Sequence, residues 1–300
     1  MKLDRREFLM SGAMASAAFA MNGASGEPQA SGGVGPLTKP PARLNLSSQE
    51  WIIPGKDLKE KLARMEEWGF DGFEVGGGGL AKRVKEIREA MAGSRLRISA
   101  VCAGYSGALI SDDENERKKA VETIKEILTP AGELGSTGLI VVPAFNNQTK
   151  LPNNEARKIL LDLLPEIGEF AAAAGTRILL EPLNRGEAFF LRQLADAAAI
   201  CRDAGSIGVR MMGDFYHMNI EETSDLGAIL SAGQFIHHVH LASRKRNLPG
   251  QDERDFTSGF RGLKMIGYRD FCSLECGVLG DRMVEIPKSV KFLRRQWERA

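Results

Sequence analysis

The chain of 300 residues is poor in cysteine, in histidine and in net charge, and each shortage excludes a class of protein. Its formal net charge of +1 gives no electrostatic support for binding nucleic acid or an anionic membrane surface. The four cysteines form no recognisable disulfide or zinc pattern, so we expect buried free thiols. No internal apolar run reaches the roughly 18 residues of a membrane-spanning helix, so we expect no span after processing. The remaining composition, with 43% hydrophobic and 26% charged residues, is that of a globular protein.

The N-terminal segment differs from the rest of the chain. Paired Arg5 and Arg6 precede the short apolar stretch 13–21, and this order resembles a twin-arginine export signal. We therefore predict a signal peptide over residues 1–20 and export to the periplasm. Residues 21–42, rich in glycine, proline, serine and alanine, are predicted to form a flexible linker. A poorly ordered N-terminal helix is the alternative.

From residue 43 onward, short apolar segments alternate with helical patterns. Strands that alternate with helices of this length predict right-handed crossovers and a parallel sheet. The expected strands are 43–48, 71–75, 96–103, 138–144, 177–181, 209–214, 235–240 and 271–275. The expected helices are 57–69, 80–92, 113–135, 153–174, 190–204, 222–231, 259–267 and 284–297, with Pro130 expected to kink or break the third of them.

Eight such units in residues 43–300 match the size of a (β/α)8 TIM barrel, which is the predicted fold. A doubly wound open sheet is the alternative. The chain has no G-x-G-x-x-G after its first strand, and the glycines 76–79 lack the spacing of that fingerprint. The polar residues described next also come from four consecutive strands, whose ends converge in a barrel but spread along an edge in an open sheet.

Four metal-binding residue types lie at the ends of these four strands. They are Glu181, Asp214, His240 and Glu275, at spacings of 33, 26 and 35 residues. Because the carboxyl ends of barrel strands surround one mouth, we expect the four side chains to converge on one divalent cation. Three oxygen ligands and one nitrogen suit Mn²⁺, the expected ion, and also Co²⁺ or Mg²⁺; Zn²⁺ usually attracts more histidine or cysteine. A single carboxylate at a strand end is more often a helix cap or a surface ion pair.

Three further polar residues follow the same strands, on segments that we expect to be loops facing the mouth. Glu187, His217 and Arg246 are candidates for binding substrate hydroxyls. The alternatives are a solvated acid, a helix-capping histidine and a solvated cation. His238 is expected to pack or hydrogen-bond in the barrel interior rather than bind metal. Cys272 and Cys276 are expected on the opposite face of the last strand, under the helices.

The strings EPLNRGE (181–187), DFYHMNIEE (214–222) and HxHxxxxxRxxPG (238–250) resemble the site motifs of ketose 3-epimerases. That group, which includes the D-tagatose, D-psicose and L-ribulose 3-epimerases, belongs to the xylose-isomerase-like TIM barrels. The resemblance covers residues 43–298. It implies two sets of site residues: the metal ligands Glu181, Asp214, His240 and Glu275, and the substrate-binding residues Glu187, His217 and Arg246 around C1 and C2.

The resemblance also implies the chemistry. Glu181 and Glu275 would lie on opposite faces of the substrate enediolate, where one removes the proton from C3 and the other returns it. The expected partner is a small sugar, and related barrels often form homo-oligomers. Lyase or dehydratase chemistry on a keto-sugar or 3-keto-glycoside, and aldose–ketose isomerisation, are alternatives. A catalytically inactive sugar-binding protein is a less favoured one, and endonuclease IV chemistry is excluded because its metal cluster is rich in histidine.

The chain departs from the ketose 3-epimerases at three places. Leu-Ala-Ser follows His240, the segment VVPAFNNQ ends the fourth strand region, and the first strand region 44–51 has little of the aromatic lining expected around a free ketohexose. These departures leave the metal ligands in place. They leave the identity of the sugar open.

Overall fold

The computed structural model describes residues 41–300. The predicted signal peptide 1–20 and all but the last two residues of the predicted linker 21–42 lie outside the described residues. Export to the periplasm therefore stays a prediction.

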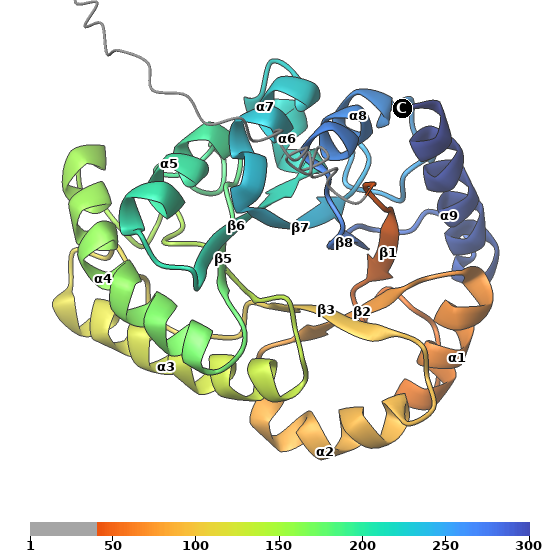
Figure 1. The fold of residues 1–300 in the computed structure, drawn as a ribbon, viewed down its shortest axis with the longest axis horizontal. Coiled ribbons are helices and arrows are strands. Elements are labelled where there is room, and N and C mark those ends of the chain that lie inside the picture. Colours follow the sequence, from red (N-terminus) through yellow and green to blue (C-terminus); the bar gives the residue numbers. More distant parts are fainter. Residues whose placement is uncertain (1–40) are drawn as a thin grey trace, which may run out of the picture. The chain divides into compact units, whose positions relative to one another are not determined.

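Eight parallel strands form one sheet that curves into a barrel, with helices around its outside (Figure 1). Their order in the sheet is β1-β8-β7-β6-β5-β4-β3-β2, so β1 and β2 meet where the barrel closes. This arrangement confirms the predicted (β/α)8 TIM barrel. The strands are β1 (Asn45–Ser48), β2 (Gly72–Gly76), β3 (Arg97–Cys102), β4 (Leu139–Val141), β5 (Ile178–Leu180), β6 (Val209–Asp214), β7 (Ile236–Leu241) and β8 (Phe271–Leu274).

The helices agree with the sequence pattern at most positions. The expected break at Pro130 does not occur, since α3 continues past this residue to Glu133. One short helix, α6, lies where only a loop was expected. The helices are α1 (Leu58–Trp68), α2 (Leu80–Met91), α3 (Glu114–Glu133), α4 (Asn153–Ala173), α5 (Leu194–Ala204), α6 (Phe215–Glu221), α7 (Asp225–Ala232), α8 (Thr257–Ile266) and α9 (Arg282–Arg299), with a 3-10 turn at Gly233–Phe235.

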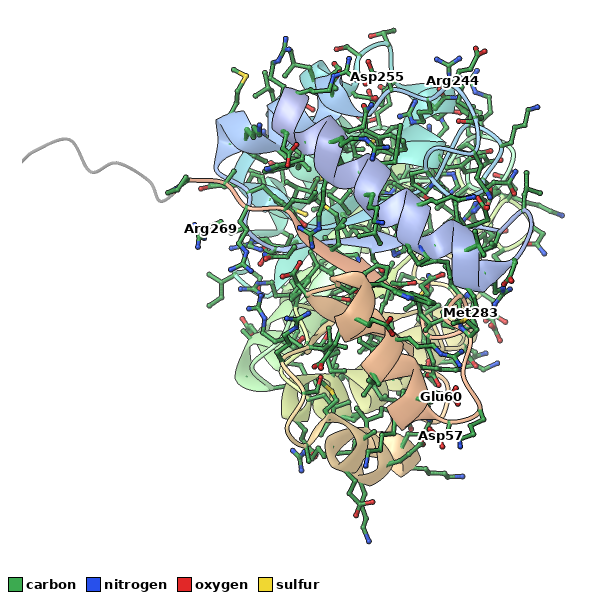
Figure 2. The ribbon with its side chains drawn as sticks, turned by 90° about the vertical axis from the view of Figure 1, so that its right-hand side faces the viewer. Asp57, Glu60, Arg244, Asp255, Arg269 and Met283 are labelled. Carbon is green, nitrogen blue, oxygen red and sulfur yellow. The ribbon has the colours of Figure 1, made fainter. Side chains whose placement is uncertain are left out.

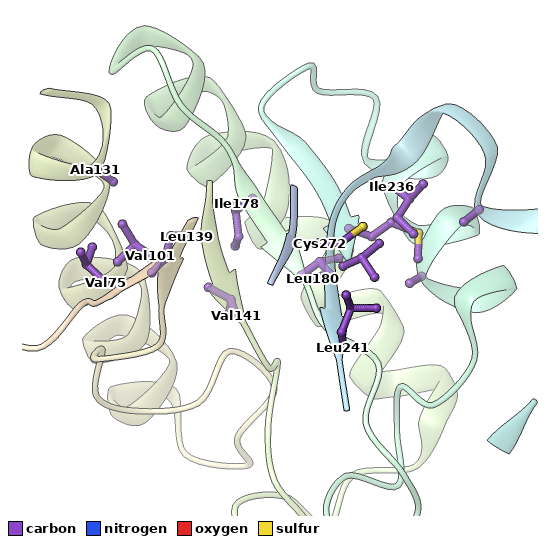
Figure 3. Close-up of a cluster of buried hydrophobic side chains, with 14 of the residues drawn as sticks. Val75, Val101, Ala131, Leu139, Val141, Ile178, Leu180, Ile236, Leu241 and Cys272 are labelled. Atoms are coloured by element: carbon purple, nitrogen blue, oxygen red, sulfur yellow. The ribbon is translucent and has the colours of Figure 1, made fainter. Parts of the chain in front are cut away.

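The main core lies between the sheet and the helices. Side chains alternate across each strand, so Leu139 and Val141 of β4 pack outward with Ile178 and Leu180 of β5 (Figure 3). The residues between them form a separate interior cluster of Ala100, Ile140, Leu179 and Met212. This apolar layer fills the barrel below the ends of the strands. The next inward positions on β5 and β6 are therefore available for polar side chains.

The two ends of the barrel lie on opposite sides of the molecule. Arg269 precedes β8, whereas Arg244 follows β7 and Met283 follows β8. Figure 2 shows Arg269 on the left and the other two residues on the right. Loops that follow the strands thus share one side, where active sites of this fold form.

Candidate metal centre

The four predicted ligands lie together at the carboxyl ends of β5 to β8. Glu181 is two residues beyond the inward-facing Leu179, and Asp214 is two beyond Met212, so alternation points both carboxylates into the barrel mouth. In the sheet register Asp214 pairs with His240. One ligand atom from each of Glu181, Asp214, His240 and Glu275 lies within 4.8 Å of the others.

Two buried atoms of this cluster lack hydrogen-bond partners among the described residues: Nδ1 of His240 and Oδ2 of Asp214. The His240 Nδ1 atom lies 3.1 Å from Oε2 of Glu275 and 3.7 Å from Oε1 of Glu181. Buried polar atoms are normally satisfied, so unpaired polar atoms gathered in one place are suited to holding a cation. One imidazole nitrogen and three carboxylate oxygens fit a divalent cation with open coordination positions.

The electrostatics of the cluster also favour a cation. Burial, reinforced by the charge of Glu275, raises the pKa of Asp214 to about 7. Burial likewise raises the pKa of Glu181. Burial acts in the same direction on Glu275, but the neighbouring His240 outweighs it and holds that pKa at about 2. Three carboxyls in one small volume therefore compete for positive charge, which a bound dication would supply.

Asp214 has two functions, one for each oxygen. Its Oδ1 accepts a hydrogen bond of 2.7 Å from the Tyr216 backbone N–H and so caps α6. Its Oδ2 faces the cluster. This cap starts the short helix Phe215–Glu221, which carries His217, so the expectation that His217 lies on a loop is wrong.

His217 is buried, and its ring is held in one tautomer. Its Nδ1 accepts a hydrogen bond of 3.1 Å from the Asn184 backbone N–H, which places the ring proton on Nε2. That Nε2 lies 3.5 Å from Oδ2 of Asp214 and faces the mouth. Burial and the nearby Arg246 charge lower the pKa of His217 to about 3. The ring is therefore a neutral donor in the site.

Arg246 links the other predicted residues. Its Nη2 donates to Oε2 of Glu275 at 2.8 Å, and its Nη1 lies 3.5 Å from both Oε1 of Glu187 and Nε2 of His217. Its backbone has φ of 57°, in the left-handed region, which is uncommon for a residue other than glycine. The guanidinium also stacks over the ring of Tyr216 at 4.8 Å. The structure thus brings all three predicted substrate-binding residues to the metal cluster.

Two cavities adjoin the cluster, and Arg246 and Glu275 line both. One of about 230 Å³ is also lined by Tyr105, Phe145, Glu181 and Glu187. The other, of about 330 Å³, is lined by Gln49, Trp51, Cys276 and Gly277 together with the same pair. A larger surface cavity of about 570 Å³ lies between α3 and α4 and contains none of the candidate site residues.

The prediction for Cys276 is wrong in one respect, the placement of its thiol away from the metal ligands. Cys272 is buried in the main core as expected, but β8 ends at Leu274, so strand alternation does not extend to Cys276. Cys276 packs against the main core, as predicted, but it also lines the second cavity beside Glu275. All four cysteines lie within residues 41–300, and all are free.

One buried acid at the site was missed from the sequence. Glu74, in the middle of β2, has no exposed surface. Its Oε2 accepts hydrogen bonds from Nε2 of His238 at 2.8 Å and from Nε2 of His240 at 3.1 Å. Its Oε1 accepts a hydrogen bond from Nε2 of Gln49 at 2.9 Å. His238 is thus a hydrogen-bonding interior residue, as predicted. The available signal was a glutamate inside an otherwise apolar strand.

Among residues 41–300, no helix has both the length and the apolar character needed to cross a bilayer.

Comparisons with known proteins give the family of this barrel. The family model described as xylose isomerase-like TIM barrel matches residues 62–296. The chain is 31% identical over 240 residues to 3-dehydro-D-guloside 4-epimerase of Escherichia coli (strain K12), covering 77% of this chain and 92% of that protein. It is 31% identical over 247 residues to L-ribulose 3-epimerase of Mesorhizobium japonicum, covering 78% of this chain and 81% of that protein.

A solved structure gives the same result for the fold. The crystal structure of 3-keto-D-glucoside 4-epimerase from E. coli superposes with a TM-score of 0.78 at 29% identity. The alignment covers 84% of this chain and all of that one.

Proposed function

This chain belongs to the xylose isomerase-like TIM barrel family and is an enzyme of the epimerase/isomerase type, and on that premise we propose that it is a divalent-metal-dependent epimerase of keto-sugars. The reaction inverts the carbon next to a ketone, which is C3 in a ketose, through an enediolate of the substrate. The observation that carries this proposal is the cluster of Glu181, Asp214, His240 and Glu275, whose ligand atoms lie within 4.8 Å of one another.

Glu181 and Glu275 are proposed as the acid–base pair. They follow β5 and β8, and Nδ1 of His240 lies 3.7 Å from the Glu181 carboxylate and 3.1 Å from the Glu275 carboxylate. A sugar bound over this imidazole would present opposite faces to the two carboxylates. One takes the proton from the carbon beside the ketone, the electron pair enters the enediolate, and the other carboxyl gives a proton to the far face. Positioned acid–base catalysis of this kind contributes about 10²–10⁴-fold.

The remaining residues have defined roles in this proposal. The cation, when bound, would polarise the substrate carbonyl and make the adjacent C–H more acidic. The neutral His217 donates its Nε2–H to a substrate oxygen. Arg246 donates from its guanidinium, and Glu187, whose Oε1 is held by the Asn184 side chain at 2.8 Å, accepts from a hydroxyl. These contacts would position the sugar relative to the acid–base pair, Glu181 and Glu275.

The substrate is proposed to be a keto-sugar that carries a second group, such as a keto-glycoside. Arg246 and Glu275 separate two adjoining cavities, and the second contains the ring of Trp51, which is 51% exposed. One relative is named for action on a 3-dehydro-D-guloside and another for L-ribulose. A free ketose occupies one cavity, whereas a glycoside can place its aglycone against Trp51. The sequence alone predicted a ketose or ketose-like substrate, and the present proposal adds a second group attached to that sugar.

The decisive experiment is incubation of Mn²⁺-loaded protein in D₂O with free ketoses and with 3-keto-glycosides. NMR is expected to show an epimer with deuterium at the carbon beside the carbonyl, and a greater kcat/KM for the keto-glycoside. Glu181→Gln and Glu275→Gln are each expected to lose about 10²-fold or more of the exchange rate. An unsaturated product would favour the lyase alternative. Absence of exchange from every substrate, with metal bound, would refute the proposal.

Three finer points are part of the same proposal. Mn²⁺ is the expected metal, because oxygen-rich sites with open positions suit it, and metal analysis of protein purified without added metal tests this. The twin-arginine signal is tested by comparing export of the full chain with that of a variant in which Arg5 and Arg6 are both lysine. Homo-oligomer formation is tested by light scattering.

A further inference from the structure

Glu74 is a carboxylate without solvent exposure, surrounded by N–H groups from three side chains. His238, His240 and Gln49 all direct a nitrogen at it, at 2.8 to 3.2 Å. An ionised carboxylate only accepts hydrogen bonds, so each facing nitrogen must carry a hydrogen.

The hydrogen on Nε2 of His240 has a direct consequence for the metal site. A neutral imidazole carries one N–H, so a proton fixed on Nε2 leaves a lone pair on Nδ1. That Nδ1 is the atom that faces Glu181 and Glu275 and lacks a partner among the described residues. A carboxylate bonded to the far nitrogen of a histidine ligand orients the ring and increases its basicity.

Gln49 connects Glu74 to a second proposed metal ligand, Glu275. Its Nε2 donates to Oε1 of Glu74 at 2.9 Å and to Oε1 of Glu275 at 3.0 Å. Because both neighbours are carboxylate oxygens, the amide nitrogen, not its oxygen, must face them. Glu74 therefore fixes His240 directly and Glu275 through one amide.

We propose that Glu74 and Gln49 form a positioning pair for the metal site: Glu74 selects the His240 tautomer that offers Nδ1 to the cation, and Gln49 holds Glu275 in place. This inference rests on the proposed metal site and adds Gln49, which follows β1, and Glu74 of β2 to a cluster supplied by the ends of β5 to β8. Neither residue is proposed to touch the cation or the substrate.

A purely structural role must be distinguished from this one, because the pair also lies where the barrel closes. Within the described residues, β1 and β2 are joined by one isolated bridge, between Gln49 and Glu74. Asp71, which directly precedes β2, supports the same junction: its Oδ2 accepts a hydrogen bond of 3.1 Å from the Leu46 backbone N–H of β1. Asp71 contacts none of the metal cluster, so Asp71→Asn is a matched control for loss of a carboxylate at this junction.

The experiment compares Mn²⁺ binding and apo-protein melting temperature in wild type, Glu74→Gln and Asp71→Asn. An amide at position 74 must turn its NH₂ group toward a donor, so it either loses Gln49 or favours the other His240 tautomer. Glu74→Gln is expected to weaken the Mn²⁺ Kd by about 10–100-fold, whereas Asp71→Asn lowers the melting temperature and keeps the wild-type Kd. Equal Kd values for Glu74→Gln and wild type, or equal losses in both variants, would overturn the inference.

A second measurement does not depend on the variant folding. In ¹⁵N-histidine protein loaded with diamagnetic Zn²⁺, His240 is expected to carry its proton on Nε2, and with four histidines in the chain the assignment is tractable. A proton on Nδ1 would overturn the inference while metal binding stands. If the wild type binds no divalent metal, the proposed function fails first, and this inference falls with it.

Discussion

Metal binding is expected to weaken strongly as the pH falls, because the cation must displace protons from its ligands. The pKa of Asp214 is about 7 in the metal-free protein, where burial and the charge of Glu275 favour its neutral form. Above pH 7 this carboxyl is mostly ionised and ready to bind. Below it, each metal ion that binds must first release a proton from Asp214.

The magnitude follows from that pKa. At pH 5.5, about 1.5 pH units below the pKa of Asp214, roughly one carboxyl in thirty is ionised, so this residue alone weakens the apparent Mn²⁺ affinity about 30-fold, or about 2 kcal/mol. Glu181 and His240, whose pKa values are also raised, increase the loss. Glu275, with a pKa of about 2, stays ionised down to pH 5.5 and therefore does not contribute to the loss of Mn²⁺ affinity.

Isothermal titration with Mn²⁺ between pH 5.5 and 8, repeated in buffers of different ionisation enthalpy, measures both the Kd and the protons released. The Kd is expected to rise at least about 30-fold from pH 8 to pH 5.5, with protons released on binding at the lower pH. Circular dichroism at each pH controls for unfolding. A Kd that stays constant, with no proton release while the fold is intact, would refute the reasoning.

Three further predictions concern single residues. His217→Phe removes one neutral hydrogen-bond donor and is expected to lower kcat/KM about 3–10-fold. The Mn²⁺ Kd is expected to stay unchanged, and an altered Kd would contradict the assignment of His217 to substrate binding. Arg246→Lys keeps the charge but cannot reach Glu275 and Glu187 together, so kcat/KM is expected to fall about 10–100-fold. The exposed Arg244→Lys is the control, with no change expected, and similar losses in both variants would contradict the assignment. Leu179→Ala opens a void in the interior layer and is expected to lower the free energy of unfolding, measured by urea titration, by about 2–5 kcal/mol. The control is Leu230→Ala, which is expected to lower it much less because Leu230 is 41% exposed. Equal losses in the two variants would contradict the packing argument.

The fold was predictable because its signals are local. Most of the strands are short apolar runs, although β1, with the sequence NLSS, is not. Leu179 lies on β5, and Glu181 lies one residue past its end, where its backbone N–H still donates to the Val141 carbonyl at 3.0 Å. Strand alternation then directs Glu181 inward without reference to any other segment. The same argument misplaced Cys276, which lies two residues past β8, because the pairing of β8 with β7 ends one residue earlier, at the bond from the Glu275 backbone N–H to the Leu241 carbonyl.

The short helix α6 shows a second limit. Asp214 has the residue type of both a metal ligand and a helix cap, and on the sequence alone these two roles were treated as alternatives. The structure assigns one oxygen to each role. A seven-residue helix offers too few turns for its periodicity to be recognised in the sequence.

The sequence by itself determined the barrel and the convergence of four strand-end residues, since both follow from repeated local patterns of strand, loop and helix. Only the tertiary structure decided which nitrogen of His240 faces the cluster. That depends on Glu74, which lies 166 residues away in the chain and meets His240 only across the closed barrel. A hydrogen bond between residues so distant in sequence has no periodic signal, because it exists only after the strands have been brought around a common axis.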